Sequence, residues 1–410
     1  MEFLTAITSA EAIRIIASFP LGEQSVVEST LTESLGAFLA TDITSTEDVP
    51  PFSRSLVDGY AVKAKDTYGA RETAPGLLRL MGDVGVGRVT EKRVGEGEAI
   101  YLATGAMVPD GADAVLMQEY VRKTADSSTD LEATKSLRVG ENICFRGEDV
   151  RTGQMVLSQG RRLSPFDVGV LAALGITKVP VFRKPLIGLI SSGDEIVPPD
   201  VVPPPGKVRD INTFTVSGLL AEQGCGLQFA GIAPDTLEGT AQKLDALKGC
   251  DMILLSGGSS KGQADFVTAA IKDLGGQILF HGLNIKPGKP TIFGTLWGKP
   301  IFGLPGHPVS CAMVVTRFVL PLVRRLTGDR MSDPFLTVRG QLTINVPSSY
   351  GIEEYVRVTI AEAEGILAVT PLFAKSSVIS MLSKADGYIV IEDGKEGLET
   401  GEEVEVHSFA

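Results

Sequence analysis

The chain has 410 residues, 43% of them hydrophobic and 21% charged, and carries a formal net charge of −12 at neutral pH. This length predicts roughly two to four globular domains, and the acidic balance argues against general nucleic-acid binding, which depends on a basic surface. Four widely separated cysteines, no signal peptide and no apolar run of about 18 residues favour a reduced, cytoplasmic protein that crosses no membrane.

The N-terminal segment predicts helices. Thr8 and Glu11 have the spacing of a capping box at the start of one helix, and we expect a second helix over residues 31–39. Much later in the chain, Ser164-Pro165 is suited to begin a further helix. We therefore predict a helical linker domain made of residues 1–49 and 140–180.

Between these two segments the pattern changes to short β runs separated by glycine turns. The runs lie at residues 77–81, 98–102 and 114–118. Short runs of this kind indicate strands, so we predict an inserted β-rich module over residues 50–139.

Strands and helices alternate over residues 181–328. Apolar runs at 186–190, 228–232, 252–255 and 300–304 are joined by helical patterns at 214–223, 237–247, 264–274 and 309–326. Continuous apolar strands joined by helices indicate a parallel sheet covered on both faces, which is a three-layer α/β domain. Ligands of such sheets bind beyond the carboxyl ends of the strands. Residues 329–410 return to short strands with glycine turns, which predicts a small C-terminal β-barrel.

A glycine-rich loop, Ser256-Gly-Gly-Ser-Ser-Lys-Gly262, joins one of these strands to a helix. Glycines let a backbone approach an anion closely, and a helix N-terminus offers unpaired N–H groups and a positive dipole end. The loop is not a Walker motif, because no Gly-Lys-Ser/Thr closes it. Lys286 and Lys289 add two cations on a proline-containing loop. Together these features predict a site for a small molecule that carries phosphate.

Carboxylates follow the strands at two places. Asp194 and Glu195 could bind Mg²⁺ directly or through water; on the motif alone a solvated turn is favoured, and the neighbouring glycine loop reverses that preference. Asp265 begins a helix, where it is either a cap or a ligand of a metal or substrate. The loops that carry Asp58, Thr104 and Asp113 read by composition alone as ordinary surface loops.

Seven motifs, taken in order, resemble the MoeA family of molybdopterin molybdenumtransferases, which in animals includes the E-domain of gephyrin. The resemblance covers nearly the whole chain. The motifs are residues 51–61, Thr104-Gly-Ala with Gly111-Ala-Asp-Ala-Val, Gly140-Glu-Asn-Ile with Gly147-Glu-Asp, Ser192-Gly-Asp-Glu, Ser256–Gly262 with Asp265, Lys286-Pro-Gly-Lys-Pro, and Leu304-Pro-Gly-His-Pro-Val-Ser.

This resemblance implies a reaction in which adenylylated molybdopterin and molybdate give molybdenum cofactor and AMP, with Mg²⁺ or a similar divalent ion. It implies a MoaB/MogA-like α/β domain and an elongated homodimer, with the linker domain serving dimerisation. The cleft would lie between the α/β domain of one subunit and the β-rich module of the other. The molybdopterin adenylyltransferase is a candidate partner.

The resemblance also implies roles for individual residues. The catalytic set is Asp58, Thr104, Asp113, Asp265, Lys286 and Lys289. The substrate-binding set is Ser256, Gly257, Gly258, Ser260, Gly262, Pro305, Gly306, Ser310 and Arg357. The metal set is Asp194, Glu195 and Asp265. No nucleophile–base pair is evident and the chain has three histidines, so positioning, metal and charge are favoured over covalent catalysis.

The chain departs from the family pattern at several positions. The family usually has Met at 57, Thr at 192, a hydrophobic residue at 261, an acidic residue at 263 and Asn at 307, where this chain has Val57, Ser192, Lys261, Gln263 and His307. The sequence does not rank molybdate against tungstate, name the divalent ion or the acceptor enzymes, or say whether these departures reduce activity. Adenylylation of molybdopterin is the alternative reaction, and a non-catalytic molybdopterin-binding scaffold is the alternative of another class.

Overall fold

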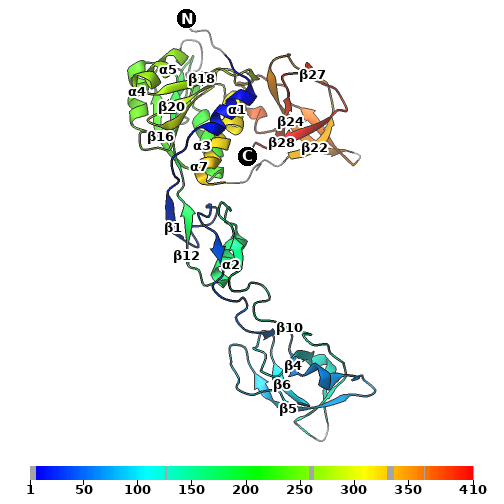
Figure 1. The fold of residues 1–410 in the computed structure, drawn as a ribbon. Coiled ribbons are helices and arrows are strands. Elements are labelled where there is room, and N and C mark those ends of the chain that lie inside the picture. Colours follow the sequence, from blue (N-terminus) through cyan, green and yellow to red (C-terminus); the bar gives the residue numbers. More distant parts are fainter. Residues whose placement is uncertain (1–5, 125–126, 258–262, 330–336, 364, 410) are drawn as a thin grey trace.

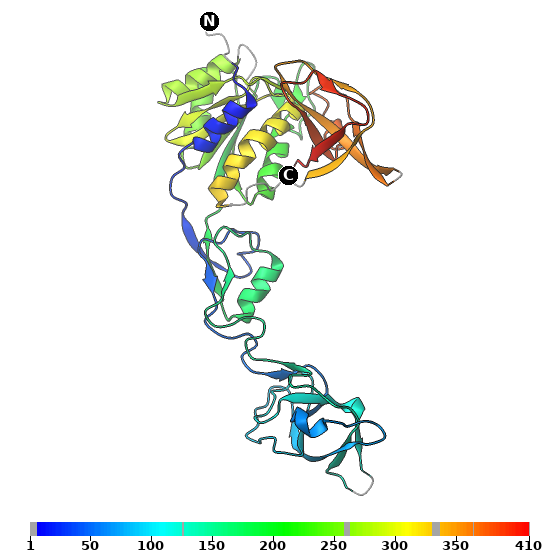
Figure 2. The ribbon, with the colours of Figure 1, turned by 45° about the vertical axis from the view of Figure 1, so that its right-hand side comes forward.

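The computed structural model describes residues 6–124, 127–257, 263–329, 337–363 and 365–409, apart from the side chains of residues 263–265 and 363. The molecule is elongated (Figures 1 and 2): an α/β unit and a β-barrel lie at one end, a β-rich module lies at the other, and a small unit connects them. In the described part of the chain, no helix is both long and apolar enough to cross a membrane.

The predicted α/β class is confirmed, with a mixed sheet at its core. The strand order is β16-β13-β17-β21-β20-β18. The strands are β13 (Leu186–Ser192), β16 (Gly226–Ala233), β17 (Met252–Ser256), β18 (Gln277–His281), β20 (Ile292–Leu296) and β21 (Lys299–Leu304). The first four strands in this order are mutually parallel. Strand β20 runs antiparallel to β21, and β18 runs antiparallel to β20 and so points the same way as the first four.

The antiparallel strand β20 was missed because a two-residue hairpin connects it to β21. Trp297 and Gly298 connect β20 to β21, and both have positive φ, at 54° and 75°. Two consecutive left-handed residues are the geometry of a tight β-hairpin, so β20 turns straight back onto β21 without a crossover helix.

Helices cover both faces of this sheet, which makes the three layers. One core cluster joins Leu189, Phe293 and Phe302 to helices on one face. Those helices are α1 (Ser9–Ser18), α3 (Asn212–Glu222), α6 (Pro308–Val314), the π-helical segment η3 (Val315–Val319) and α7 (Leu320–Thr327). On the other face Ile253 and Ile301 pack against α4 (Leu237–Asp245) and α5 (Gln263–Asp273).

Helix α1 belongs physically to this α/β unit, although residues 1–49 were assigned to the linker. Its apolar face buries Ala12 and Ile16 in the sheet's core cluster. Arg325 also donates hydrogen bonds to the carbonyls of Ile16 (3.0 Å) and Phe19 (2.9 Å) at the end of the helix. The other predicted domain boundaries remain predictions.

The connecting unit is less helical than expected. It contains α2 (Pro165–Ala173), and two short pairs, β1 (Val26–Thr30) with β12 (Lys178–Phe182) and β2 (Ile43–Thr44) with β11 (Met155–Leu157). The predicted helix over residues 31–39 is wrong. Gly36 has a φ of 76°, and Leu39 is extended and pairs with Val181, which buries it in the unit's core.

The β-rich module has a six-stranded sheet of order β7-β4-β6-β5-β9-β8. The strands are β4 (Gly59–Val62), β5 (Gly76–Val84), β6 (Glu98–Leu102), β7 (Ala114–Met117), β8 (Val121–Lys123) and β9 (Asp130–Ala133), with short helical turns η1 (Ala64–Thr67) and η2 (Gln118–Tyr120). A short pair, β3 (Arg54–Ser55) with β10 (Ile143–Cys144), lies where the chain enters and leaves the module.

The predicted C-terminal barrel is confirmed as a closed ring of five strands. They run in the order β24-β25-β22-β28-β26, and β26 pairs back with β24. The strands are β22 (Thr337–Leu342), β24 (Glu353–Ala363), β25 (Ile366–Pro371), β26 (Gly387–Ile391) and β28 (Glu403–His407), with a side pair β23 (Val346–Pro347) and β27 (Gly397–Leu398) and a turn η4 (Ile379–Met381). Strand β19 (Ile285–Lys286) of the α/β unit pairs with β24, which ties the barrel to that unit.

Candidate active site

A cavity of about 450 Å³ lies at the carboxyl ends of the parallel strands. Loops that follow β13, β17 and β21 contribute to its wall, as the predicted parallel topology requires. The lining residues are Ser191, Ser192, Glu195, Ile196, Val208, Arg209, Asp210, Ile211, Asn212, Ser256, Gly257, Pro290, Pro305, Gly306, His307, Pro308, Ser310 and Ser377. Thus Glu195, Ser256, Gly257, Pro305, Gly306 and Ser310, all predicted site residues, meet around one space.

Gly257 allows these loops to approach one another. Its φ is +93°, and a Cβ atom added there would lie 2.2 Å from the Ser192 carbonyl oxygen. Its N–H donates to the Leu304 carbonyl (3.2 Å). Because only glycine combines this backbone angle with this proximity, the residue fixes where the loop after β17 meets its two neighbours.

Asn212, at the start of α3, joins two of the loops. This buried side chain donates through Nδ2 to Ser256 Oγ (2.7 Å) and to the Gly306 carbonyl (2.9 Å). Its Oδ1 has no hydrogen-bond partner among the described residues. Nearby Asp210 accepts from the Thr213 N–H (3.1 Å) and hydroxyl (2.6 Å), which fixes the first turn of the helix.

Neither Asp210 nor Asn212 was among the residues predicted for the site. The signal that could have found them is the location of two polar residues at the start of a crossover helix, beside the strand ends.

Two of the predicted metal carboxylates, Asp194 and Glu195, have different surroundings. Glu195 lines the cavity, whereas exposed Asp194 accepts a hydrogen bond from the Asp235 N–H (3.2 Å). Asp235 in turn accepts from Ser192 Oγ (3.2 Å) and the Asp194 N–H (3.3 Å). Asp235 was missed by the sequence analysis, although it follows β16 just as the other site residues follow their strands.

Asp265 lies in α5, but its side chain is outside the described residues, as are Gly258, Ser260, Lys261 and Gly262. Among the side chains that are described, no group of three or more His, Cys, Asp or Glu residues could hold a metal ion.

Cys311 lies beside the cavity residue Ser256. Its Sγ lies 4.0 Å from Ser256 Oγ, and it is fully covered by α/β core residues. Burial raises the pKa of this thiol to about 12. A thiol that remains protonated at neutral pH is a poor nucleophile.

The barrel borders one side of the cavity. His307 Nδ1 lies 3.2 Å from Ser376 Oγ, and the Val309 N–H donates to the Ser376 carbonyl (3.1 Å). Ser377, the next residue, lines the cavity. The barrel is therefore part of the site and not a separate appendage.

Arg357, on β24, is a buried cation. It is 8% exposed, and Nη2 donates to the Ala374 carbonyl (2.7 Å). Within the described part of the chain, Nη1 has no hydrogen-bond partner and no carboxylate pairs with the guanidinium. Burial lowers the pKa of Arg357. A buried, incompletely bonded guanidinium favours an anion beside it.

The two lysines of the predicted phosphate site lie on the loop that leads to cavity residue Pro290. Both are exposed, and neither lines the cavity itself. Lys286 Nζ is 2.8 Å from Glu354 Oε1, and Glu354 Oε2 accepts from Ser348 Oγ (3.0 Å). Lys286 is therefore tied to the barrel.

The predicted residues of the β-rich module lie far from this cavity in the same chain. Asp58 precedes β4 and Thr104 follows β6, at the opposite end of the molecule from the α/β unit (Figure 1). The two residues do lie together: Asp58 Oδ1 accepts from the Thr104 N–H (2.7 Å) and hydroxyl (3.2 Å). Asp113 instead accepts from the Ala64 N–H (2.6 Å), a contact within the module.

Three family profiles together match most of the chain. They are the MoeA N-terminal region (domains I and II) at residues 7–175, a probable molybdopterin binding domain at residues 188–325, and the MoeA C-terminal region (domain IV) at residues 339–409. The α/β unit with its cavity thus falls within the molybdopterin-binding match, which defines a protein of molybdenum cofactor biosynthesis.

Named relatives support the same family as the three profiles. The molybdopterin molybdenumtransferase of Bacillus subtilis is 33% identical over 410 residues, which cover 99% of this chain and 95% of that protein. The enzyme of the same name from Haemophilus influenzae is 33% identical, covering 92% and 93%. A crystal structure of the molybdopterin biosynthesis MoeA protein of Pyrococcus horikoshii has a TM-score of 0.85 and 35% identity, covering 99% and 100%. This chain belongs to the MoeA family of molybdopterin molybdenumtransferases and is a transferase of molybdenum cofactor biosynthesis.

Proposed function

We propose that this chain inserts molybdate into adenylylated molybdopterin and releases AMP. The observation that supports this most directly is the cavity where the loops after β13, β17 and β21 meet, inside the part of the chain that matches molybdopterin-binding domains. Its position at the carboxyl ends of parallel strands is the usual ligand position of this architecture.

The phosphate groups of the substrate would bind where the loop after β17 leads into α5. Backbone N–H groups at the helix start attract anions, and Lys286 and Lys289 lie on the loop that reaches the cavity at Pro290. Gly258, Ser260 and Gly262 stay predicted ligands of the same group. Arg357 would bind an anion on the barrel side, because its Nη1 is a donor with no hydrogen-bond partner among the described residues.

A divalent ion, taken here as Mg²⁺, would be held by Asp194, Glu195 and Asp265. The donor chemistry fits, because Mg²⁺ prefers carboxylate oxygens and keeps several waters, and Glu195 lines the cavity without an ion pair among the described residues. When bound, the ion would polarise the phosphoanhydride bond. The chain's own residues would orient the substrate and offset its charge, which is catalysis by positioning and electrostatics.

We further propose that the working site needs two chains. Asp58 and Thr104 form one exposed pair in the module, which lies at the far end of the same chain from the cavity. A homodimer in which the module of one subunit covers the cavity of the other would bring the two halves together, with Asp113 in the same module. The molybdopterin adenylyltransferase is a fitting source of the substrate, and the cytoplasm a fitting location.

The test is incubation of the protein with adenylylated molybdopterin, Mg²⁺ and either molybdate or tungstate, with AMP measured over time. Release of AMP that depends on the oxyanion supports the proposal, and the faster oxyanion identifies the substrate. Formation of adenylylated molybdopterin from ATP would favour the adenylyltransferase alternative instead. Tight binding without AMP release under any condition would favour the scaffold.

A further inference from the structure

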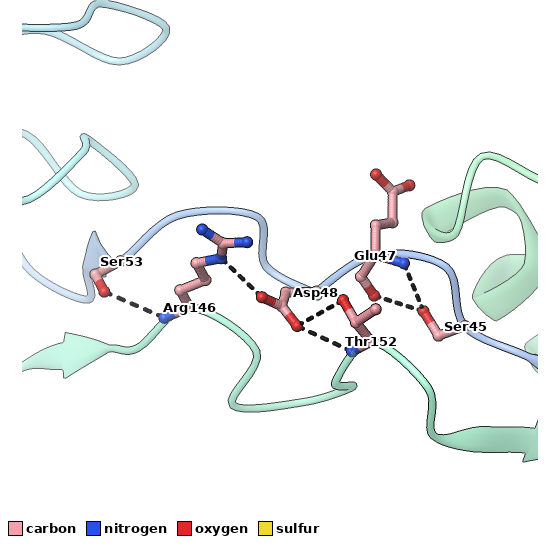
Figure 3. Close-up of polar contacts among 6 residues, drawn as sticks. All are labelled: Ser45, Glu47, Asp48, Ser53, Arg146 and Thr152. Atoms are coloured by element: carbon pink, nitrogen blue, oxygen red, sulfur yellow. Dashed lines mark hydrogen bonds and ion pairs between the residues drawn. The ribbon is translucent and has the colours of Figure 1, made fainter.

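The junction between the connecting unit and the β-rich module is narrow. The chain crosses it twice, once along residues 45–53 and once along residues 146–152 (Figure 3). As the structure describes them, the hydrophobic core of the connecting unit shares no residue with those of the module. The direction in which the module leaves the molecule therefore depends on the contacts between these two crossings.

One carboxylate, that of Asp48, connects both crossings. Its Oδ1 accepts hydrogen bonds from the Thr152 N–H (2.9 Å) and the Thr152 hydroxyl (3.0 Å), and its Oδ2 accepts from Arg146 Nε (2.7 Å). Arg146 also donates its backbone N–H to Ser53 Oγ (3.1 Å) on the first crossing (Figure 3). The backbone hydrogen bond from Thr152, followed by the side-chain hydrogen bond from Arg146, lowers the pKa of Asp48, so the carboxylate is charged at neutral pH.

The backbone around Asp48 is shaped to allow this contact. Gly147 has a φ of 67°, and a Cβ atom added there would lie 3.3 Å from the Asp48 carboxylate carbon. Backbone bonds from Gly147 to the Pro50 carbonyl (3.0 Å) and from Asp149 to the Val49 carbonyl (3.1 Å) join the crossings. A two-stranded ribbon of this kind is only marginally stable alone, so it does not by itself fix a direction.

We infer that Asp48 is a positioning residue that fixes the direction of the β-rich module relative to the rest of the chain. It binds two residues about one hundred positions later in the sequence, on the returning crossing. Asp58 and Thr104 belong to the module, so its direction also sets their position. The consequence for catalysis rests on the proposed function, in which these two residues complete the cavity of a partner subunit.

The experiment measures a distance across the junction in the full-length protein. Nitroxide labels are placed at Lys123→Cys in the module and Lys178→Cys in the connecting unit, after Cys144→Ser and Cys225→Ser remove the two partly exposed cysteines. Labelled chains are diluted with unlabelled chain so that only intrachain pairs are recorded. A second pair inside the module, Glu91→Cys with Lys123→Cys, reports whether the module stays folded.

We expect a narrow distance distribution for the junction pair in the unsubstituted protein and a broad one in Asp48→Ala. Asp48→Asn should be intermediate, because an amide oxygen can still accept from Thr152 but loses the attraction to Arg146. The matched control is Glu47→Gln, which removes the same charge from the neighbouring residue, whose carboxylate points away from this network (Figure 3). A junction distribution in Asp48→Ala as narrow as in Glu47→Gln would overturn the inference.

A variant that unfolds the module is detected by the internal pair. If Asp48→Ala also broadens the distance distribution of the internal pair, Thr152→Val is measured instead, since it removes only the hydroxyl donor to Asp48. Broadening of the junction pair alone in Thr152→Val supports the inference. An unchanged junction distribution in that variant overturns it.

Activity separates this inference from the proposed function. Misplacement of catalytic groups by about 1 Å can cost roughly a hundredfold in rate, so Asp48→Ala should lower the kcat for AMP release by about ten- to a hundredfold, with a smaller change in KM. A broad distribution with full AMP release would leave the positioning role intact and overturn the two-chain site. A narrow distribution with slow AMP release would overturn the positioning role and leave the two-chain site intact.

Discussion

The cavity of the α/β unit and the Asp58–Thr104 pair of the β-rich module are organised in opposite ways. In the cavity, Gly257 lies against the Ser192 carbonyl and Asn212 joins two loops, so the backbone itself sets the geometry. In the module, the two residues are exposed, and among the described contacts the Asp58 carboxylate bonds only to Thr104. One half of the predicted site is therefore preorganised, and the other depends on where the module is placed.

The sharpest way to break the preorganised half is Gly257→Ala. The added methyl would clash with the Ser192 carbonyl at 2.2 Å in a left-handed backbone, and such strain costs on the order of 1–3 kcal/mol before the clash is counted. We expect a loss of at least about a hundredfold in AMP release, together with a lower melting temperature. Gly218→Ala is the control, since no atom lies within 4 Å of a Cβ there; a similar loss in that variant would contradict the explanation.

The other half is tested by mixing two inactive chains. Asp58→Ala damages only the module, and Asn212→Ala damages only the cavity, where it removes two hydrogen bonds. If each site combines a cavity with the partner's module, equal mixing should restore about a quarter of full activity, because half the dimers are mixed and each has one intact site. AMP release after subunit exchange measures this. If no activity returns although exchange is complete, both halves belong to one chain.

The cavity could be predicted from the sequence better than the placement of the Asp58–Thr104 pair. Strand and helix patterns at residues 186–304 place the loops after β13, β17 and β21 on one edge, because parallel strands share a carboxyl end. The position of the cavity was therefore predictable, and six of its lining residues were predicted. Asp235 and Asn212 were not assigned to the site, since their roles arise from contacts between loops about 40 and 90 positions apart. Asp58 lies far from the cavity because of the direction in which the β-rich module leaves the connecting unit. That direction is set by contacts between residues 45–53 and 146–152, and no local sequence pattern predicts it.

Local patterns also failed where tertiary packing outweighed them. Residues 31–39 contain enough apolar positions for a helix. In the structure Leu39 instead pairs with Val181 and is buried in the core of the connecting unit, and this burial stabilises the extended conformation. Capping signals were more dependable: Ser164 caps α2 as predicted, and it also forms a capping box with Asp167, because these interactions are complete within one turn of helix.

Arg357 tests whether the barrel contributes charge or only packing. Hydrogen bonds to charged groups are worth about 1.5–3 kcal/mol, so Arg357→Met should weaken binding of the anionic substrate by roughly ten- to a hundredfold. The same change should leave the melting temperature equal or higher, because replacing an uncompensated buried charge with an apolar side chain is often stabilising. Calorimetry and AMP release measure the two effects.

Arg324→Met is the matched control for that experiment. Arg324 is equally buried, at 8%, but its Nε donates to Gln223 Oε1 (3.1 Å). Its loss should lower the melting temperature without a direct effect on substrate affinity. If Arg357→Met destabilises the protein as much as Arg324→Met and leaves binding unchanged, Arg357 is a packing residue.

The smallest expected effect concerns the ion pair between Lys286 and the barrel. Lys286 is 63% exposed and Glu354 only 13%, with 2.8 Å between Nζ and Oε1. Because water screens the exposed lysine, the pair should stabilise the fold by no more than about 1 kcal/mol, and Glu354→Gln should shift the denaturant midpoint only slightly. Lys286→Gln should shift it as little, yet it should weaken binding of adenylylated molybdopterin far more, because it removes the cation and not merely its partner. Equal losses of affinity in the two variants would instead mean that Lys286 acts through the barrel and does not contact the phosphates.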